Sequence, residues 1–229
     1  GTVHFIFQPA EEGGGGAQAL LADGLFERFP CDAVYGLHNR PGMPVGQFAI
    51  RPGPVMAGAV FFDIVVQGRG GHGARPESSV DPVIAGAQIV SALQTIVSRN
   101  VAALDSAVIS VTGFTAVEAY NVIPDRVALK GTVRAFKVET MRLLEERMRA
   151  VAQSVAAGFG ATAEVTWREI AAPTINTPEE ATAMADAAAA LVGEAHVERN
   201  RTPVMGSEDF AYMLLEKPGA YIHVGNGTG

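Results

Sequence analysis

The order of predicted elements in residues 57–172 constrains the fold more than any other feature of the chain. Between Ala59 and Gln67 every second residue is a large apolar one: Val60, Phe62, Ile64 and Val66. This alternation indicates a strand with one buried face. Asp81 followed by Pro82 predicts a helix start, because aspartate is a favoured cap and proline suits the first helical position. Three further strands are predicted at 107–114, 127–136 and 162–168. A second amphipathic helix is predicted at 141–155, between the last two of them. This strand, helix, strand, strand, helix, strand order predicts a ferredoxin-like (βαββαβ) domain that can fold by itself.

The flanking residues 1–56 and 173–229 predict the two parts of an α/β layer that the central domain interrupts. Residues 3–7 are mostly apolar and predict a short, largely buried strand, followed by a helix that begins near Ala17. The last predicted strand is 220–224. Neither flank has enough strands for a complete sheet domain. We therefore expect the flanks to fold together, and the whole chain to belong to the α/β class.

Composition excludes several classes of protein. The 229 residues are 48% hydrophobic and 18% charged, as is typical of globular proteins. A net charge of −7 without a lysine or arginine cluster argues against nucleic-acid binding, and no apolar run approaches the roughly 20 residues that cross a bilayer. One cysteine, Cys31, excludes an internal disulfide framework and fits a reducing compartment, so we expect a cytoplasmic protein.

Two adjacent glutamates, Glu11 and Glu12, follow the first predicted strand and precede the four glycines 13–16. Neighbouring carboxylates are costly to keep ionised unless a cation or a proton lies between them, so the pair suits a metal ligand beside a general base. Taken alone, such a pair before a glycine-rich loop is more commonly a solvated helix start, where carboxylates favour the positive end of the helix dipole. His38 ends a second apolar run. It could supply a ligand or be a core histidine with a satisfied hydrogen bond.

Other candidate motifs have weaker support. The glycines of Gly68-x-Gly70-x-x-Gly73 formally match the dinucleotide-binding fingerprint, but that fingerprint requires a helix that opens within the motif, and here Pro76 intervenes before the cap at Asp81. Cys31 lies away from the acidic motifs. We interpret it as structural, and we interpret three further histidines as structural or surface residues: His4, His196 and His223.

Seven short motifs span the chain in a fixed order: 8–12, 36–38, 51–57, 68–72, 121–125, 131–134 and 205–210. In this order they resemble the M20 metallopeptidase family, and within it the amidohydrolase branch that includes hippurate hydrolases and indole-acetyl-amino-acid hydrolases. The resemblance covers essentially the whole chain. It implies a partial metallopeptidase catalytic domain in 1–56 and 173–229, interrupted by a ferredoxin-like lid and dimerisation domain in 57–172.

The resemblance implies roles for the residues of the first two motifs. Glu11 matches the general base and acid, Glu12 matches a metal ligand, and His38 matches a further ligand. The implied cofactors are divalent ions, two in a complete site, and carboxylate and imidazole ligands suit Mn, Zn, Co or Ni. A bound metal favours the ionised form of a water, and Glu11 would move the proton to the departing nitrogen. The implied reaction is hydrolysis of an N-acyl amino acid, hippurate-like, to a carboxylic acid and an amino acid.

Residues of the central domain take roles in substrate binding under the same resemblance. His72 matches a lid histidine that reaches the partner subunit's active site and stabilises the tetrahedral oxyanion. Asn121 and Arg134 match residues that hold the substrate, with the guanidinium suited to a carboxylate. The resemblance thus implies a homodimer formed through the lid domain. From the residues alone, His72 is a loop histidine and Arg134 a solvent-exposed sheet residue.

The chain departs from the family pattern at both ends. Members of the branch have an upstream Cys-x-His segment and a histidine near the C-terminus, and this sequence contains neither, so we expect an internal fragment of a longer protein. With Glu12 and His38 as its only expected ligands, the fragment itself should bind metal weakly and turn over little. Two alternatives stay open: a dipeptidase or carboxypeptidase of the same family, and a non-catalytic dimerisation or binding module.

Overall fold

The computed structural model describes residues 1–116 and 119–227, which fold into two compact units. Unit 1 contains residues 1–58 and 170–229, and unit 2 contains residues 59–169. Each unit has its own sheet and its own core, and the two are described separately below. Among the described residues, no helix has the length and apolar character needed to cross a membrane.

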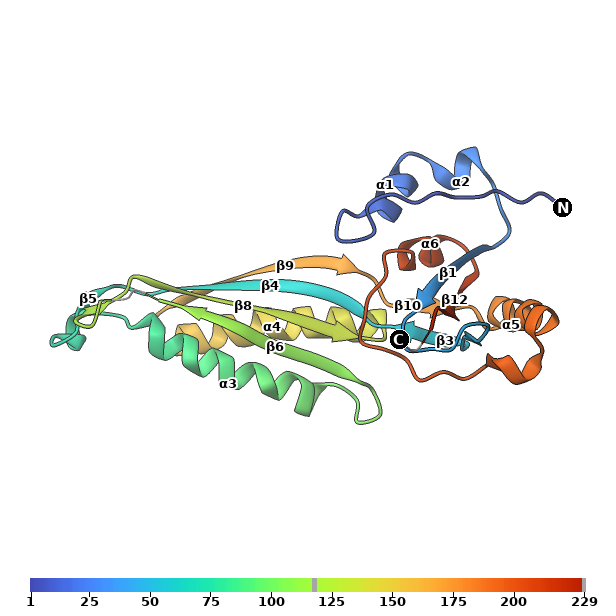
Figure 1. The fold of residues 1–229 in the computed structure, drawn as a ribbon. Coiled ribbons are helices and arrows are strands. Elements are labelled where there is room, and N and C mark those ends of the chain that lie inside the picture. The colour runs from blue at the N-terminus through green and yellow to red at the C-terminus, as the bar shows by residue number, and fades with distance from the viewer. Residues whose placement is uncertain (117–118, 228–229) are drawn as a thin grey trace. The chain divides into compact units, whose positions relative to one another are not determined.

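Unit 2 is a four-stranded sheet with two long helices. Its elements run in the order β4 (Gly58–Gln67), α3 (Pro82–Asn100), β6 (Ala107–Thr115), β8 (Arg126–Ala135), α4 (Val138–Gly158) and β9 (Thr162–Ala171). The strands lie in the order β6-β8-β4-β9. Both helices pack on one face of this sheet (Figure 1). The strands and helices predicted for this region are confirmed.

Local sequence explains how unit 2 forms. The predicted alternation in β4 is confirmed, because Val60, Phe62, Ile64 and Val66 are all fully buried against the helices. The Asp81 carboxylate caps α3 by accepting a hydrogen bond of 2.8 Å from the Val83 backbone N–H. The result is one continuous apolar core.

The loops of unit 2 contain a second, two-stranded sheet. β5 (Gly71–His72) pairs antiparallel with β7 (Val122–Ile123), with His72 opposite Val122. The short 3-10 helix η1 (Pro76–Ser78) lies between β5 and α3 in the sequence. This small sheet brings the loop of residues 68–76 beside the loop that precedes β8.

Unit 1 has a four-stranded sheet with the strand order β1-β12-β2-β11. Its strands are β1 (Val34–Arg40), β2 (Phe48–Ala49), β11 (Val197–Glu198) and β12 (Gly219–Gly225). β1 and β12 run parallel, and His38 lies directly beside His223 in the register. A separate antiparallel pair joins β3 (Gly53–Met56) to β10 (Thr174–Asn176).

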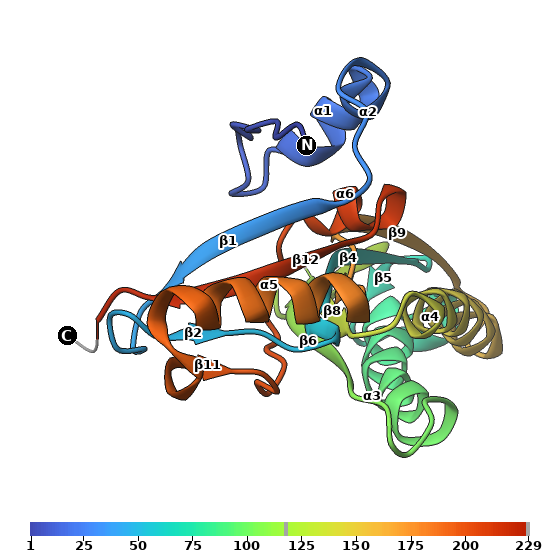
Figure 2. The ribbon, with the colours of Figure 1, turned by 90° about the vertical axis from the view of Figure 1, so that its right-hand side faces the viewer.

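Unit 1 also contains helices of different lengths. They are α1 (Gly16–Ala22), α2 (Leu25–Arg28), α5 (Pro178–Val192), η2 (Glu194–His196) and α6 (Ala211–Glu216). The alanine-rich face of α5 packs with Ile222 of β12, and Figure 2 shows this helix running along the strands. The predicted helix from Ala17 is present but ends at Ala22. Gly24, with φ of 78°, turns the chain before α2.

The predicted strand at residues 3–7 is wrong. These residues form no strand, and Val3, Phe5 and Phe7 are 76%, 85% and 91% exposed. A strand needs a neighbour for its backbone hydrogen bonds and a face to bury, and within the described residues no strand pairs with this segment. Apolar composition alone therefore does not make this segment a strand.

Candidate metal centre

The centre of the candidate site is a cluster of three carboxylates, Glu11, Glu208 and Asp209. Glu11 lies in the turn that leads to α1, and the other two directly precede α6. Each offers one carboxylate oxygen, and these oxygens lie within 4.8 Å of one another. Glu208 and Asp209 are 6% and 3% exposed. Residues almost 200 positions apart in the sequence thus meet in one acidic cluster.

The backbone around Glu11 is tightly constrained. Ala10 has φ of 52°, a left-handed conformation that costs a non-glycine residue about 1 kcal/mol or more. Gly16 lies so close to the preceding chain that a Cβ there would be 1.5 Å from the Pro9 carbonyl oxygen. The glycine run therefore allows the chain to fold back on itself and to present Glu11 toward Glu208 and Asp209.

Hydrogen bonds fix the two buried carboxylates. Asp209 Oδ2 accepts a hydrogen bond of 3.0 Å from the Ala17 backbone N–H, and the Gln8 amide donates to Oδ1. Glu208 Oε1 accepts from the Phe210 backbone N–H at 3.2 Å, and its Oε2 accepts from the Tyr221 hydroxyl. None of these four donors carries a formal charge.

The electrostatics of the cluster favour a cation. Burial raises the pKa of Glu11, and repulsion from Glu208, Glu12 and Asp209 raises it further, while His38 lowers it. Within the described part of the chain, no lysine or arginine forms an ion pair with these carboxylates. A divalent ion would relieve this repulsion, so the donor set fits a metal.

Two histidines face the same pocket from neighbouring strands. The ring centroids of His38 on β1 and His223 on β12 are 6.5 Å apart. His38 Nδ1 lies within hydrogen-bonding distance of the Asn39 carbonyl, which leaves Nε2 for a ligand. Burial lowers the pKa of His223 to about 4, and electrostatic interactions with Arg40, His38 and Arg201 lower it further. A neutral imidazole is the form that binds metals.

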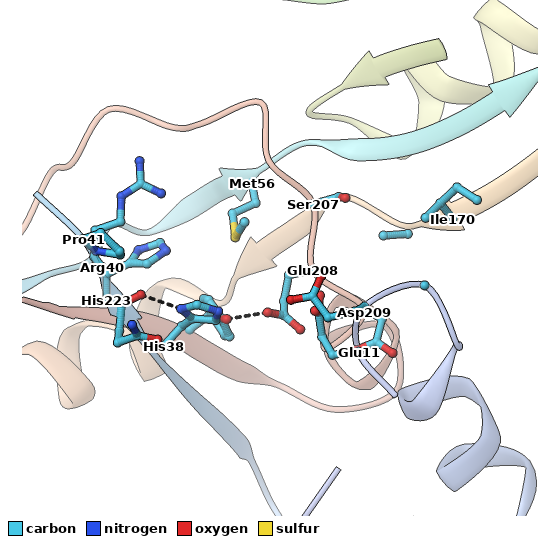
Figure 3. Close-up of a pocket in the computed structure, with 15 residues that line it drawn as sticks. Glu11, His38, Arg40, Pro41, Met56, Ile170, Ser207, Glu208, Asp209 and His223 are labelled. Carbon is cyan, nitrogen blue, oxygen red and sulfur yellow. Dashed lines mark hydrogen bonds between the residues drawn. The ribbon is translucent and has the colours of Figure 1, made fainter. Parts of the chain in front are cut away.

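These groups line a pocket of about 370 Å³, drawn in Figure 3. The predicted residues Glu11, Glu12 and His38 all lie on its wall. Glu12 is exposed and is not among the three closely spaced carboxylates. Apolar side chains of Met56 and Ile170 line the pocket beside the charged groups. The arrangement places oxygen and nitrogen ligands next to a surface suited to an apolar part of a substrate.

The predicted substrate residues lie in unit 2. His72 and Asn121 line a second pocket of about 520 Å³, formed where β5 pairs with β7. Arg134 lies on β8, lines neither pocket, and its guanidinium donates to Thr132 Oγ1 and to the Val133 carbonyl. Burial lowers the pKa of Arg134. The fold thus brings His72 and Asn121 together and leaves Arg134 apart.

No role for Glu208, Asp209 or Tyr221 is predicted from the sequence, and His223 is predicted to be a structural or surface residue. The structure corrects the surface interpretation, because His223 is 5% exposed and lines the pocket. A signal for two of these residues was available. Glu208 and Asp209 are adjacent acids next to the apolar run Phe210–Leu215, which is the same pattern that identified Glu11 and Glu12.

Two curated proteins are similar to this chain in sequence. The sequence is 42% identical over 229 residues to the N-acetylcysteine deacetylase of Bacillus subtilis (strain 168), covering 100% of this chain and 59% of that protein. It is 40% identical over 226 residues to the hippurate hydrolase of Campylobacter jejuni, covering 99% of this chain and 59% of that protein. The chain therefore spans about three fifths of the length of these relatives.

A solved structure is also similar. The YXEP protein of Bacillus subtilis, a dinuclear metal binding peptidase from the M20 family, matches with a TM-score of 0.81 and 37% identity, over 98% of this chain and 56% of that one. The sequence profile of Peptidase family M20/M25/M40 matches residues 1–229. The chain belongs to this family.

Proposed function

We propose that this chain provides part of the active site of a metal-dependent amidohydrolase that hydrolyses N-acyl amino acids. The observation that carries the proposal is the cluster of Glu11, Glu208 and Asp209, whose close oxygens have no counter-cation among the described residues. Family membership supports the reaction class. The names of two relatives, an N-acetylcysteine deacetylase and a hippurate hydrolase, support an acylated amino acid as the substrate.

The residues that would hold the metal come from the pocket wall. Glu12 and His38 are the ligands that the sequence predicted, and Glu208, Asp209 and His223 are further donors in the same pocket. Carboxylate and imidazole donors together suit Mn, Zn, Co or Ni. The dinuclear relative supports two ions in a complete site. When bound, such an ion supplies Lewis-acid chemistry, favouring the ionised form of a water and polarising an amide carbonyl.

Glu11 would act as the general base and then as the general acid. Its carboxylate takes one proton from the attacking water, whose oxygen forms a bond to the amide carbon. The same carboxylate passes that proton to the amide nitrogen as the carbon–nitrogen bond breaks, which releases a carboxylic acid and an amino acid. A raised pKa suits this role, because a base whose pKa approaches the working pH can both accept and donate the proton.

Unit 2 would contribute to substrate binding and to assembly. We propose residues 57–172 as a ferredoxin-like lid and dimerisation domain, which the strand order β6-β8-β4-β9 supports. His72 would stabilise the oxyanion, and Asn121 and Arg134 would hold the substrate. Light scattering after size-exclusion chromatography, on the full-length protein and on 57–172, tests the homodimer. A monomer at high concentration in both samples would count against it.

Hydrolysis by the full-length protein tests the proposed reaction. The protein is stripped of metal, refilled with Mn, Zn, Co or Ni, and assayed on N-acyl amino acids that include hippurate. Activity should return with metal and should fall by about 10²- to 10⁴-fold in Glu11→Gln, because a general base contributes on this scale. Glu27→Gln is the matched control, since Glu27 is an exposed acid on α2.

The other outcomes separate the alternatives. Equal activity in Glu11→Gln and Glu27→Gln would remove Glu11 as the base. Loss of metal binding in Glu11→Gln would make Glu11 a ligand instead. Activity on dipeptides alone would favour a dipeptidase or carboxypeptidase, and activity on neither substrate class would favour a non-catalytic module.

We expect the 229-residue chain by itself to be inactive, and the whole protein to be cytoplasmic.

A further inference from the structure

Tyr221 occupies an unusual position beside the acidic cluster. It is 4% exposed, and its hydroxyl donates a hydrogen bond to Glu208 Oε2. The other oxygen of Glu208 accepts from the Phe210 backbone N–H. Each oxygen of this carboxylate therefore has one donor from the protein. A carboxylate oxygen has two lone pairs, so one remains on each oxygen for another partner.

The ring of Tyr221 is held on several sides. Its centroid lies 5.5 Å from that of Phe210, 5.6 Å from His223 and 6.4 Å from His38. Gly36 on β1 lies against the same ring, because a Cβ at Gly36 would be 2.7 Å from Tyr221 Cδ2. In this packing the Tyr221 hydroxyl points to Glu208 Oε2.

The backbone of Tyr221 is fixed by a buried amide. Asn176, on β10, is fully buried. Its Oδ1 accepts from the Tyr221 backbone N–H at 2.7 Å, and its Nδ2 donates to the Tyr221 carbonyl at 3.0 Å and to the Arg51 carbonyl at 2.9 Å. The amide thus uses both of its donors and its acceptor, as a buried amide requires. It holds Tyr221 at both of its backbone polar groups.

We propose that Tyr221 is a positioning residue that orients the Glu208 carboxylate toward the pocket for a divalent metal, and that Asn176 fixes Tyr221 for this purpose. The inference rests on the proposed function, because it requires Glu208 to face a metal. Partners of this kind restrict a ligand to one orientation, and their loss commonly weakens metal binding by about 10- to 100-fold.

The test is metal binding by the full-length Tyr221→Phe protein, which keeps the ring and removes only the hydroxyl. Affinity for Co²⁺ and Mn²⁺ is measured by competition with a chelator, and the visible spectrum of the Co²⁺ form is recorded. We expect affinity to fall by about 10- to 100-fold and the Co²⁺ bands to shift. Tyr35→Phe is the matched control, since Tyr35 is 50% exposed on β1 and does not line the pocket.

The possible results distinguish failure of the proposed function from failure of the positioning role of Tyr221. If wild type binds neither ion, the proposed function and this inference both fail. If wild type binds and Tyr221→Phe matches Tyr35→Phe in affinity and spectrum, only the inference fails. Thermal unfolding of the metal-free proteins completes the test. A Tyr221→Phe protein that is already unfolded without metal would show a structural role and overturn the positioning role.

Discussion

Unit 2 packs its helices and sheet around one apolar cluster, whereas unit 1 has two smaller clusters and buries charged groups beside them. In the described residues of unit 2, no ionisable side chain is in the buried class. In unit 1, Glu208, Asp209 and His223 are all buried. The difference indicates a division of labour in one chain. Unit 2 gains stability from apolar burial, while unit 1 bears the cost of burying ionisable groups beside its candidate metal site.

The largest expected effect is on the core of unit 2. Phe62 is fully buried on β4, and Phe61 beside it points to the other face and is 45% exposed. Phe62→Ala should lower the free energy of unfolding by about 3–5 kcal/mol, because it removes a buried ring and leaves a cavity. Denaturant titration measures this change.

Phe61→Ala is the matched control for that substitution. The same ring is removed one position away, and we expect a cost below about 1 kcal/mol because the site is partly solvated. Similar decreases in the free energy of unfolding for Phe62→Ala and Phe61→Ala would contradict the comparison of the two units, since unit 2 would then not depend on its apolar core.

A smaller effect is expected from the buried histidine of unit 1, His223, in the metal-free protein. Burial lowers the pKa of His223 from 6.5 to about 4, so the folded chain holds it neutral while the unfolded chain binds a proton below pH 6.5. This contribution to stability is present above pH 6.5 and is lost as the pH falls toward 4, by up to about 1.4 kcal/mol per pH unit. His223→Asn should remove it.

Unfolding by urea at pH 7 and pH 5, with chelator present, measures the contribution of His223. The loss of stability between the two values should be smaller in His223→Asn than in wild type by roughly 1–2 kcal/mol. His196→Asn, at an exposed histidine of η2, is the control and should behave like wild type. The raised pKa of Glu11 changes stability in the opposite direction, because stability falls as the pH rises above 4.5. This contribution is the same in wild type, His223→Asn and His196→Asn, so it does not affect the comparison. Equal losses in all three proteins would refute the lowered pKa of His223.

Periodicity predicted much of unit 2 because its packing is regular. A strand with one buried face must alternate, so Val60 and Phe62 identify β4 without any structural information. The helix cap at Asp81 is equally local, since the capping hydrogen bond reaches only to Val83. Neighbouring residues therefore determine most of the elements of this unit.

Unit 1 was harder to predict because its interactions are distant in the sequence. Residues 3–7 have strand composition but no partner strand in the described chain, so composition predicted a strand that does not form. Glu11 was a candidate from its neighbour Glu12, while its closer companions Glu208 and Asp209 come from the other end of the chain. His223 became part of the site only through its register with His38.

The antiparallel pairing of β3 with β10 has a consequence for the order of folding. Met56 and Thr174 are Cα partners, and the chain between them includes all of unit 2. Closing a flexible loop of about 100 residues costs roughly 4 kcal/mol of chain entropy, by the logarithmic dependence on loop length. If unit 2 folds first, its compact structure replaces that flexible loop before the two halves of unit 1 meet. Met56 lines the carboxylate pocket. Assembly of this pocket would therefore follow the folding of unit 2, whose apolar core contributes none of the proposed metal ligands.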